Sequence, residues 1–269
     1  MKDSRRGEVG MSINKFGLLN ALYEIVNSKE HDNDYAVASY LLDNIKRINE
    51  VSVNELVNCA FTTPSAIRRF CHRIGYDNFS ELKVSFSHLI FPSNLRLRQF
   101  HPMSEYRVQR LDSIRRVIQD IEKNFTDTMV ETIVSLIVSY KKVILVSANN
   151  TSSELIKFQQ ELLFAEKIVY VISKDYKENS MLEEIDDETL LLVSSVSGTF
   201  AAEASEWVRG LPSYNILLTG NRDPEFLESY HDCFYMSGQD IKNDVTGVYG
   251  KYGLTLIFDF ISESFFYHS

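Results

Sequence analysis

Apolar positions in the first third of the chain recur with the period of short helices. In residues 35–48 they return every three or four positions, which predicts an amphipathic helix. Ser52 and Glu55 have the spacing of a capping box, in which the hydroxyl accepts a hydrogen bond from a free backbone N–H and the carboxylate reaches back to another. A second helix is therefore predicted from Val53 to about Cys59.

A third helix is predicted from Pro64 to about Ile74. Thr63 is a suitable N-cap, proline is common at the first helical position, and Gly75 is a typical C-terminal stop. One face of this helix has the spacing of a buried stripe, with Ile67, Phe70, Cys71 and Ile74. The opposite face carries Ser65, Arg68, Arg69, His72 and Arg73.

The second and third helices are separated by a short turn, and the third is basic on its free face. A helix-turn-helix protein uses such a pair to read the major groove of DNA. The same pattern also fits a three-helix bundle whose arginines are simply solvated. Residues 91–124 follow, with prolines near their start and then a helical period, which predicts a connector and a linking helix.

The second half of the chain changes to short apolar runs rich in β-branched residues, which alternate with helical segments. Five such runs are predicted to be strands: residues 142–147, 167–173, 189–195, 214–220 and 232–236. Strands that are apolar throughout are typical of parallel sheets covered on both faces. The fold class predicted for the chain is α plus α/β: a helical N-terminal domain, then a doubly wound, five-stranded parallel sheet.

Hydroxyl side chains follow the first and third predicted strands, where each leads into a helix. They are Thr151, Ser152, Ser195, Ser197 and Thr199. Ligands bind doubly wound sheets at the carboxyl ends of the strands, and the free N–H groups of a helix N-terminus favour an anion. A phosphate site is therefore predicted at this edge. The alternative is that these residues only cap helices.

Composition and charge place limits on the class of protein. The 269 residues are 44% hydrophobic and 24% charged, without an apolar run of membrane-spanning length or a signal peptide, so a cytoplasmic protein is expected. Cys59, Cys71 and Cys233 are far apart and are interpreted as reduced thiols; no disulfide, metal or cofactor is predicted. Residues 1–124 carry a net charge of +3 and residues 125–269 one of -12, a hint that the first part faces nucleic acid.

Residues 52–83, "SVNELVNCAFTTPSAIRRFCHRIGYDNFSELK", resemble the helix-turn-helix of RpiR-type (MurR-type) bacterial transcriptional regulators. The matching positions are Arg69, Phe70, Arg73, Gly75, Tyr76, Phe79, Glu81, Leu82 and Lys83. The second half looks like the sugar isomerase (SIS) domain that follows in such regulators. The resemblance implies a helix-turn-helix domain in residues 1–92, a linker and linking helix in residues 93–124, and a SIS-like domain in residues 125–269.

The resemblance and the patterns together name two sets of candidate residues. The DNA-contacting set is Thr63, Ser65, Ala66, Arg68, Arg69, His72 and Arg73. The set expected to bind a phosphorylated sugar is Asn149, Asn150, Thr151, Ser152, Ser195, Ser197, Gly198 and Thr199.

Several positions depart from the family pattern. The turn before the third helix, where Gly or Asn is usual, has Phe61, so a distorted turn is expected. Asn149 and Asn150 replace glycines, and Phe200 stands where the second SIS signature ends in Thr.

Three functions are compatible with these observations. The first is a DNA-binding regulator of carbohydrate metabolism that responds to a phosphorylated sugar. The second is the same regulator with a SIS-like domain used only for dimerisation. The third is a phosphosugar isomerase, for which Glu154, Glu203 and His231 are the candidate acids and bases, although no catalytic residue is assigned. A homodimer or homotetramer is expected, because the C-terminal helix has more apolar residues than one narrow stripe holds.

Overall fold

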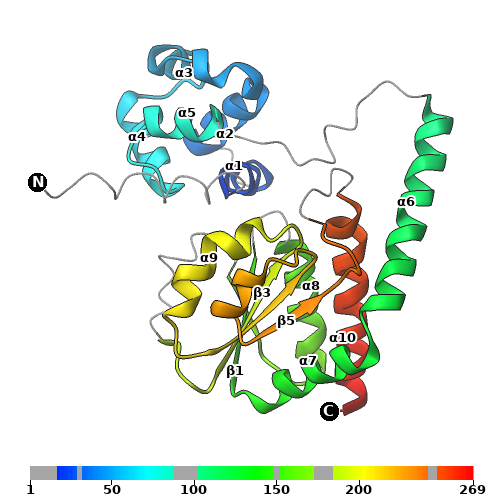
Figure 1. The fold of residues 1–269 in the computed structure, drawn as a ribbon. Coiled ribbons are helices and arrows are strands. Elements are labelled where there is room, and N and C mark those ends of the chain that lie inside the picture. Colours follow the sequence, from blue (N-terminus) through cyan, green and yellow to red (C-terminus); the bar gives the residue numbers. More distant parts are fainter. Residues whose placement is uncertain are drawn as a thin grey trace, which may run out of the picture. The chain divides into compact units, whose positions relative to one another are not determined.

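The structure is a computed structural model that describes residues 17–28, 32–87, 102–147, 152–172, 184–241 and 247–268. The chain divides into two compact units, unit 1 from Met1 to Ile90 and unit 2 from Phe91 to Ser269 (Figure 1). None of the described helices is long and apolar enough to span a bilayer.

Unit 1 consists of helices. They are α1 (Gly17–Asn27), α2 (Asn33–Asp43), the 3-10 helix η2 (Ile45–Glu50), α3 (Val53–Cys59), α4 (Pro64–Arg73) and α5 (Phe79–Ser87). Their buried side chains form one core, to which α1 contributes Leu18 and Leu22, α2 contributes Leu41, α4 contributes Phe70, and α5 contributes Leu82. The predicted second and third helices are confirmed as α3 and α4.

Side-chain caps set where these helices begin. The Ser52 hydroxyl accepts a hydrogen bond from the Glu55 N–H at 3.1 Å, and the Thr63 hydroxyl accepts one from the Ala66 N–H at 3.2 Å. The Glu55 carboxylate also accepts a hydrogen bond from Tyr40 and forms an ion pair with Arg47. Hydrogen bonds from Tyr40, Arg47 and the Ser52 backbone N–H lower the pKa of Glu55, and the last of these is the second half of the predicted capping box. The hydrogen bond to Glu55 raises the pKa of Tyr40 to about 12, and this cluster joins α2 and η2 to α3.

The helix predicted over residues 35–48 is interrupted. Helix α2 ends at Asp43, and the chain continues as η2. Both the backbone N–H and the side-chain amide of Asn44 donate to the Tyr40 carbonyl, the latter at 2.8 Å. A local side-chain bond of this kind competes with helix continuation, and hydrophobic periodicity does not reveal it.

The ends of α3 and α4 have the same geometry. After α4, Gly75 has φ 86° and the Tyr76 N–H donates to the Cys71 carbonyl. After α3, Phe61 has φ 50° and the Thr62 N–H donates to the Val57 carbonyl. Both are Schellman motifs, which require a left-handed residue and normally have glycine there. The expectation of a distorted turn is therefore wrong, because Phe61 adopts the glycine conformation.

Unit 2 is a parallel sheet with helices on both faces. Its strands are β1 (Lys142–Ser147), β2 (Tyr170–Ile172), β3 (Thr189–Ser195), β4 (Tyr214–Thr219) and β5 (Asp232–Tyr235). Its helices are α6 (Met103–Asn124), α7 (Asp127–Ser139), α8 (Ser152–Phe164), α9 (Thr199–Arg209), η7 (Pro224–Glu228), η8 (Tyr249–Gly253) and α10 (Leu254–His268). The strand order is β2-β1-β3-β4-β5 and all pairs are parallel, so the predicted fold class is confirmed.

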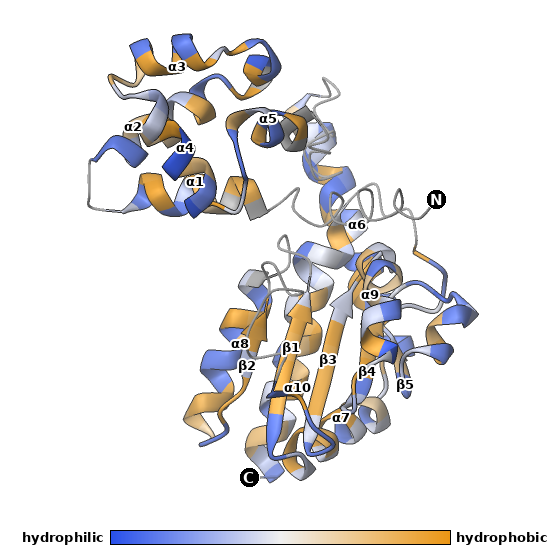
Figure 2. Ribbon diagram, turned by 90° about the vertical axis from the view of Figure 1, so that its left-hand side faces the viewer, coloured by the Kyte–Doolittle hydropathy of each residue, from blue (hydrophilic) through white to orange (hydrophobic). Residues whose placement is uncertain are grey.

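The helices form two layers about the sheet. Figure 1 shows α9 on one face and α7, α8 and α10 on the other. Figure 2 shows β1 and β3 as hydrophobic along most of their length, in keeping with their burial on both faces. Helix α10 buries Leu254, Ile257, Phe258, Ile261 and Phe265 in the core of unit 2, whereas Phe266 is exposed. The apolar residues of α10 thus lie mainly within the core of unit 2.

The last turns of helix α6 pack in the core of unit 2. Val117 and Ile121 lie in the same buried cluster as residues of the sheet and α10, whereas Val108, Leu111 and Ile118 are exposed. The boundary between the two units therefore precedes this helix.

We expect Ile121→Ala to lower the free energy of unfolding of unit 2 by about 2 to 5 kcal/mol, because it leaves a cavity at a fully buried position. Ile118→Ala is the matched control on the same helix, since Ile118 is 45% exposed, and it should change stability by about 0.5 kcal/mol or less. Trp207, the single tryptophan of the chain, lies on α9, so its fluorescence during urea unfolding reports unit 2. Equal losses in both variants would contradict this packing of α6.

Candidate functional site

The free face of α4 carries exposed polar and basic side chains. Ser65, Arg68, Arg69 and His72 are exposed, and the helix contains no acidic residue. The opposite face places Ile67, Phe70 and Cys71 in the core of unit 1, where burial raises the pKa of Cys71 to about 11. Packing therefore fixes the rotation of α4 and presents Arg68, Arg69 and His72 to the surroundings.

Arg73 and Thr63 have structural partners in addition to any role in binding. The Arg73 guanidinium forms an ion pair with Asp34 at the start of α2. Burial raises the pKa of Asp34, and the positive charge of Arg73 opposes that rise. The Thr63 hydroxyl is occupied as the cap of α4. Arg73 thus holds two helices together, and its loss would leave a buried carboxylate without its main counter-charge.

Ala66 is in a different place from the one predicted. It is only 7% exposed, so its methyl group does not lie on the open face with Ser65 and Arg69. Ala66 directly precedes Ile67, whose side chain packs in the core of unit 1. Among the predicted DNA-contacting residues, Ala66 is therefore the one that the structure withdraws from the surface.

Most of the residues after α4 that match the helix-turn-helix pattern stabilise the fold of unit 1. Glu81 accepts a hydrogen bond from the Asp77 N–H at 2.7 Å, and Asn78 accepts one from the Glu81 N–H at 3.0 Å, which together cap α5. The Lys83 ammonium donates to the carbonyls of Asn49 and Val51, which closes the end of η2. The matching pattern therefore mainly specifies a domain that presents α4.

The predicted effector site lies where β1 and β3 are neighbours. Six consecutive residue pairs join the two strands, from Lys142–Thr189 to Ser147–Ser194, so the segments after them leave the same edge of the sheet. This is the point where the strand order reverses. Asn149, Asn150 and Thr151 lie outside the described residues, and Ser152 is the first residue of α8.

The segment between β3 and α9 is a compact turn. The buried Ser195 hydroxyl accepts a hydrogen bond from the Ala201 N–H at 3.2 Å, which makes it a structural cap inside α9. The Ser197 hydroxyl lies farther out, 3.1 Å from the Thr199 hydroxyl and within reach of the Thr199 N–H. The Ser197 and Thr199 hydroxyls thus lie side by side, whereas the Ser195 hydroxyl is used to cap α9. Phe200 is buried.

Gly198 is required by this turn for two reasons. Its φ is 78°, a conformation that side chains disfavour, and a Cβ there would lie 2.3 Å from the Asn221 amide nitrogen. Asn221, just after β4, donates to the Ser197 carbonyl at 2.9 Å. Asn221 therefore connects the loop after β4 to the loop after β3.

Sequence reasoning missed a hydrogen-bonded cluster around Asp120 of α6. Its carboxylate accepts hydrogen bonds from Ser237, Tyr249, the Gly238 N–H and Asn124. Burial alone would raise the pKa of Asp120, but these hydrogen bonds outweigh it and lower the pKa. The cluster attaches α6 to the segment after β5. In the sequence, the signal that points to Asp120 is its place between Val117 and Ile121, two apolar positions of the predicted linking helix.

Ser194 was also missed. It is fully buried at the end of β3, next to Ser147 of β1, and its hydroxyl has no hydrogen-bond partner among the described residues. It lies on the opposite face of the strand from Ser195, because neighbouring strand residues alternate.

The candidate acids and bases do not form a catalytic constellation. Glu154, in the first turn of α8, accepts a hydrogen bond from Ser153. His231 precedes β5, so it lies at the amino edge of the sheet, opposite the β1–β3 switch point, and its Nδ1 accepts a hydrogen bond from the Asn215 N–H. Glu203 lies on α9. Within the described part of the chain, no group of His, Cys, Asp and Glu has the arrangement of a metal site.

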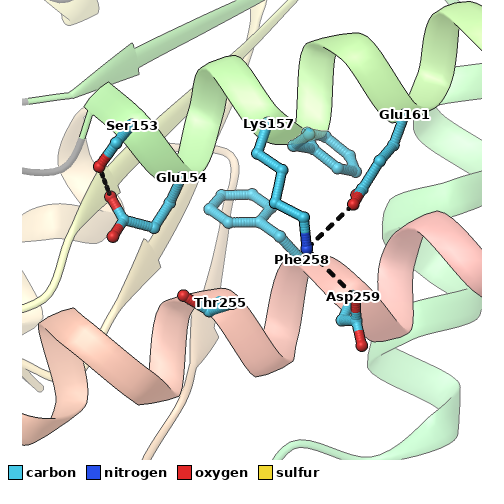
Figure 3. Close-up of a pocket in the computed structure, with 8 residues that line it drawn as sticks. Ser153, Glu154, Lys157, Glu161, Thr255, Phe258 and Asp259 are labelled. Carbon is cyan, nitrogen blue, oxygen red and sulfur yellow. Dashed lines mark hydrogen bonds and ion pairs between the residues drawn. The ribbon is translucent and has the colours of Figure 1, made fainter.

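A hollow of about 200 Å³ lies on the flank of unit 2, between α8 and α10. Figure 3 shows Lys157 of α8 pointing between Glu161 and Asp259, with which it forms ion pairs. These charged side chains lie across the hollow. None of the predicted effector residues lines it, although Ser153 and Glu154 follow Ser152 at the start of α8.

Comparison with known proteins finds a family match in the first unit. Residues 19–91 match the helix-turn-helix domain of the rpiR family. This part of the chain is therefore similar to the DNA-binding domain of that family. A stretch of 117 residues, 44% of the chain, is 27% identical to an uncharacterised HTH-type transcriptional regulator of Caldanaerobacter subterraneus subsp. tengcongensis. That match spans 39% of the length of this curated relative.

Similarity to solved structures extends over both units. The NanR protein of Vibrio vulnificus, solved in complex with ManNAc-6P, matches 93% of this chain and 92% of its own chain, with a TM-score of 0.50 and 15% identity. A hypothetical protein of known structure matches 62% of this chain and 90% of its own, with a TM-score of 0.50 and 17% identity. At these identities the similarity establishes the fold alone.

We expect Asp120→Asn to be less stable than the wild type at neutral pH, because an amide cannot accept all the hydrogen bonds that the carboxylate accepts. The folded-state pKa is lowered, so the contribution of Asp120 is complete above its unfolded pKa of about 4 and is lost as the pH falls through the folded value. The difference between wild type and variant, followed by Trp207 fluorescence, should therefore shrink below about pH 4. Asp112→Asn, which alters an exposed pair with Arg116 on the same helix, should show a much smaller difference.

Proposed function

We propose that this chain is a DNA-binding transcriptional regulator of carbohydrate metabolism that responds to a phosphorylated sugar. The observation that carries the proposal is the exposed basic face of α4 within an rpiR-family helix-turn-helix domain. No catalytic role is proposed, in keeping with the regulator family. A protein that binds a bacterial chromosome works in the cytoplasm, the compartment expected from the sequence.

Helix α4 is the proposed reading helix. The N-terminal residues of such a helix contact base edges, and cationic side chains around them bind phosphates. Ser65 and Arg69 are proposed to face base edges, with Arg68 and His72 on the backbone. Thr63 lies at the entering end of the helix as its cap. Arg73 is proposed to contribute less to DNA binding than Arg69, because its guanidinium is paired with Asp34.

A sugar phosphate is the proposed effector at the β1–β3 switch point. The support is the paired Ser197 and Thr199 hydroxyls, which lie at the start of α9, where the positive end of the helix dipole favours an anion. The NanR protein, whose fold this chain shares, was solved with ManNAc-6P. Gly198 leaves room for the Asn221 side chain to pack against this turn, and Ser195 caps α9 beneath it.

A continuous chain of hydrogen bonds offers a route from this turn to α6. Asn221 holds the Ser197 carbonyl, and its neighbour Arg222 donates to the Ser237 carbonyl at 2.5 Å. The Ser237 hydroxyl then donates to Asp120 of α6 at 2.6 Å. We propose that effector binding shifts the residues along this route and thereby changes the placement of the DNA-reading units. This requires that the effector bind more tightly to one arrangement of these units than to the other.

A homodimer or homotetramer is proposed as the working form. One reading helix covers a single half-site, and two related by a dyad give the specificity that operators need. Exposed apolar side chains that could support self-association lie on α6, with Val108, Leu111 and Ile118, and on α10, with Phe260, Phe266 and Tyr267.

We expect Arg69→Ala to weaken binding to a selected operator by about 1 to 3 kcal/mol, the value of a bidentate arginine contact to a base. The measurement is fluorescence anisotropy with a duplex recovered by the wild-type protein from a genomic fragment library. Binding should also weaken steeply with salt as counterions are released, and Arg68→Ala should reduce that salt dependence.

Arg107→Ala is the control, since it removes one exposed positive charge from α6 and leaves α4 intact. Arg73→Ala is not used as a test of reading, because it also removes the partner of Asp34. If Arg69→Ala and Arg107→Ala bind the operator equally well while both remain folded, α4 is not the reading helix.

Titration calorimetry with hexose, pentose and amino-sugar phosphates tests the effector site. We expect one class to bind the wild type and to bind Ser197→Ala about tenfold more weakly, because a hydrogen bond to a charged group is lost. Ser205→Ala is the control, since the Ser205 hydroxyl bonds only to the Ala201 carbonyl within α9 in the described structure. A binder that is unaffected by Ser197→Ala would place the site elsewhere, and the absence of any binder would favour the dimerisation-only alternative.

A further inference from the structure

Phe61 is the most exposed large apolar side chain in the described part of the protein, with 91% of its surface accessible. It lies in the turn between α3 and α4, and its backbone φ is 50°. The Schellman hydrogen bond from the Thr62 N–H to the Val57 carbonyl, at 3.0 Å, holds this conformation. The chain therefore places a phenylalanine where the backbone geometry favours glycine.

Folding alone does not account for this choice. A residue with a Cβ is disfavoured in the left-handed region, whereas glycine adopts it freely, as Gly75 does at the end of α4. The ring of Phe61 is almost fully solvated, so it contributes little to the core of unit 1. Strained residues that the surrounding structure maintains are concentrated at functional sites, which makes a role in binding worth testing.

The position of Phe61 indicates what it contacts. It precedes Pro64, the first residue of α4, by three positions and is followed by the exposed Thr63 and Ser65. This is the end of a reading helix that enters the major groove. The main apolar group that the major groove presents is the C5 methyl of thymine, and phenylalanine is among the side chains that contact it.

We propose that Phe61 makes an apolar contact with a thymine methyl group of the operator and so adds sequence preference beside the contacts of α4. The inference rests on the proposed DNA-binding function. DNA is favoured over a protein partner because Phe61 directly precedes the exposed residues of the proposed reading helix, Thr63 and Ser65 at its start and Arg68 and Arg69 one turn later.

The test compares Phe61→Gly with wild type in two measurements. Hydrogen–deuterium exchange of α3 and α4 peptides should show equal or greater protection in Phe61→Gly, because the strained conformation is relieved. Anisotropy with a duplex that the wild type selects from a random-sequence library should show about tenfold weaker binding, because the apolar contact is lost. Stability and affinity thus change in opposite directions, which loss of folding cannot produce.

A scan of the same duplex, replacing each thymine by deoxyuracil, identifies the methyl group. Wild type should lose about fourfold in affinity at one position, the amount expected for one buried methyl. Phe61→Gly should lose nothing further at that position, and Phe61→Leu, which keeps an apolar side chain, should fall between the two. Should Phe61→Gly be less protected in exchange, Phe61→Asn replaces it, because asparagine also tolerates this backbone conformation.

Equal operator affinity of wild type and Phe61→Gly would overturn the inference, as would a scan without a position that depends on Phe61. If Arg69→Ala still weakens binding in that case, the proposed function stands and only the role of Phe61 fails. If neither variant affects binding, the proposed function fails as well. A change in oligomeric state of Phe61→Gly by light scattering, with unchanged DNA affinity, would assign the ring to a protein contact instead.

Discussion

The parallel pairing of β1 with β3 is the constraint on which unit 2 depends. Both strands are apolar and buried on both faces, so they can only form the centre of a sheet that helices cover on either side. Their six paired positions bring the segments after both strands to one edge, where the strand order reverses. The turn that contains Ser197 and Gly198 owes its location to this pairing.

The carboxyl edge of the sheet is also where α6 is attached. Ser197, Asn221, Ser237 and Asp120 come from four separate parts of unit 2. Asn221 donates to the Ser197 carbonyl, its neighbour Arg222 donates to the Ser237 carbonyl, and the Ser237 hydroxyl donates to Asp120. Asp120 is held as a carboxylate by its donors, and the last turns of the same helix are buried in the core. In the proposed response, a ligand that moves the turn after β3 would act on α6, the helix that follows the first unit along the chain. This arrangement gives a physical route for the proposed response.

Unit 1 separates residues that build the fold from residues that are free to bind. The family pattern is satisfied mainly by core and capping residues, such as Phe70, Leu82 and Lys83. Arg73 is in an intermediate position because its charge compensates the buried Asp34. Arg68 and Arg69 remain open. Charge alone does not distinguish these arginines in the sequence, since the difference depends on a partner 39 positions earlier in the chain.

The sequence by itself determined the elements whose signals are local. Thr63, Pro64 and Gly75 set the bounds of α4, and continuous apolar runs located all five strands, because caps and burial on both faces leave direct marks in the residue pattern. Only the tertiary structure decided which hydroxyls are free, that Ala66 is buried, that Glu55 binds Tyr40 and Arg47, and that Asp120 meets Ser237. These outcomes depend on contacts between residues distant in the chain, and neither periodicity nor spacing along one segment contains that information.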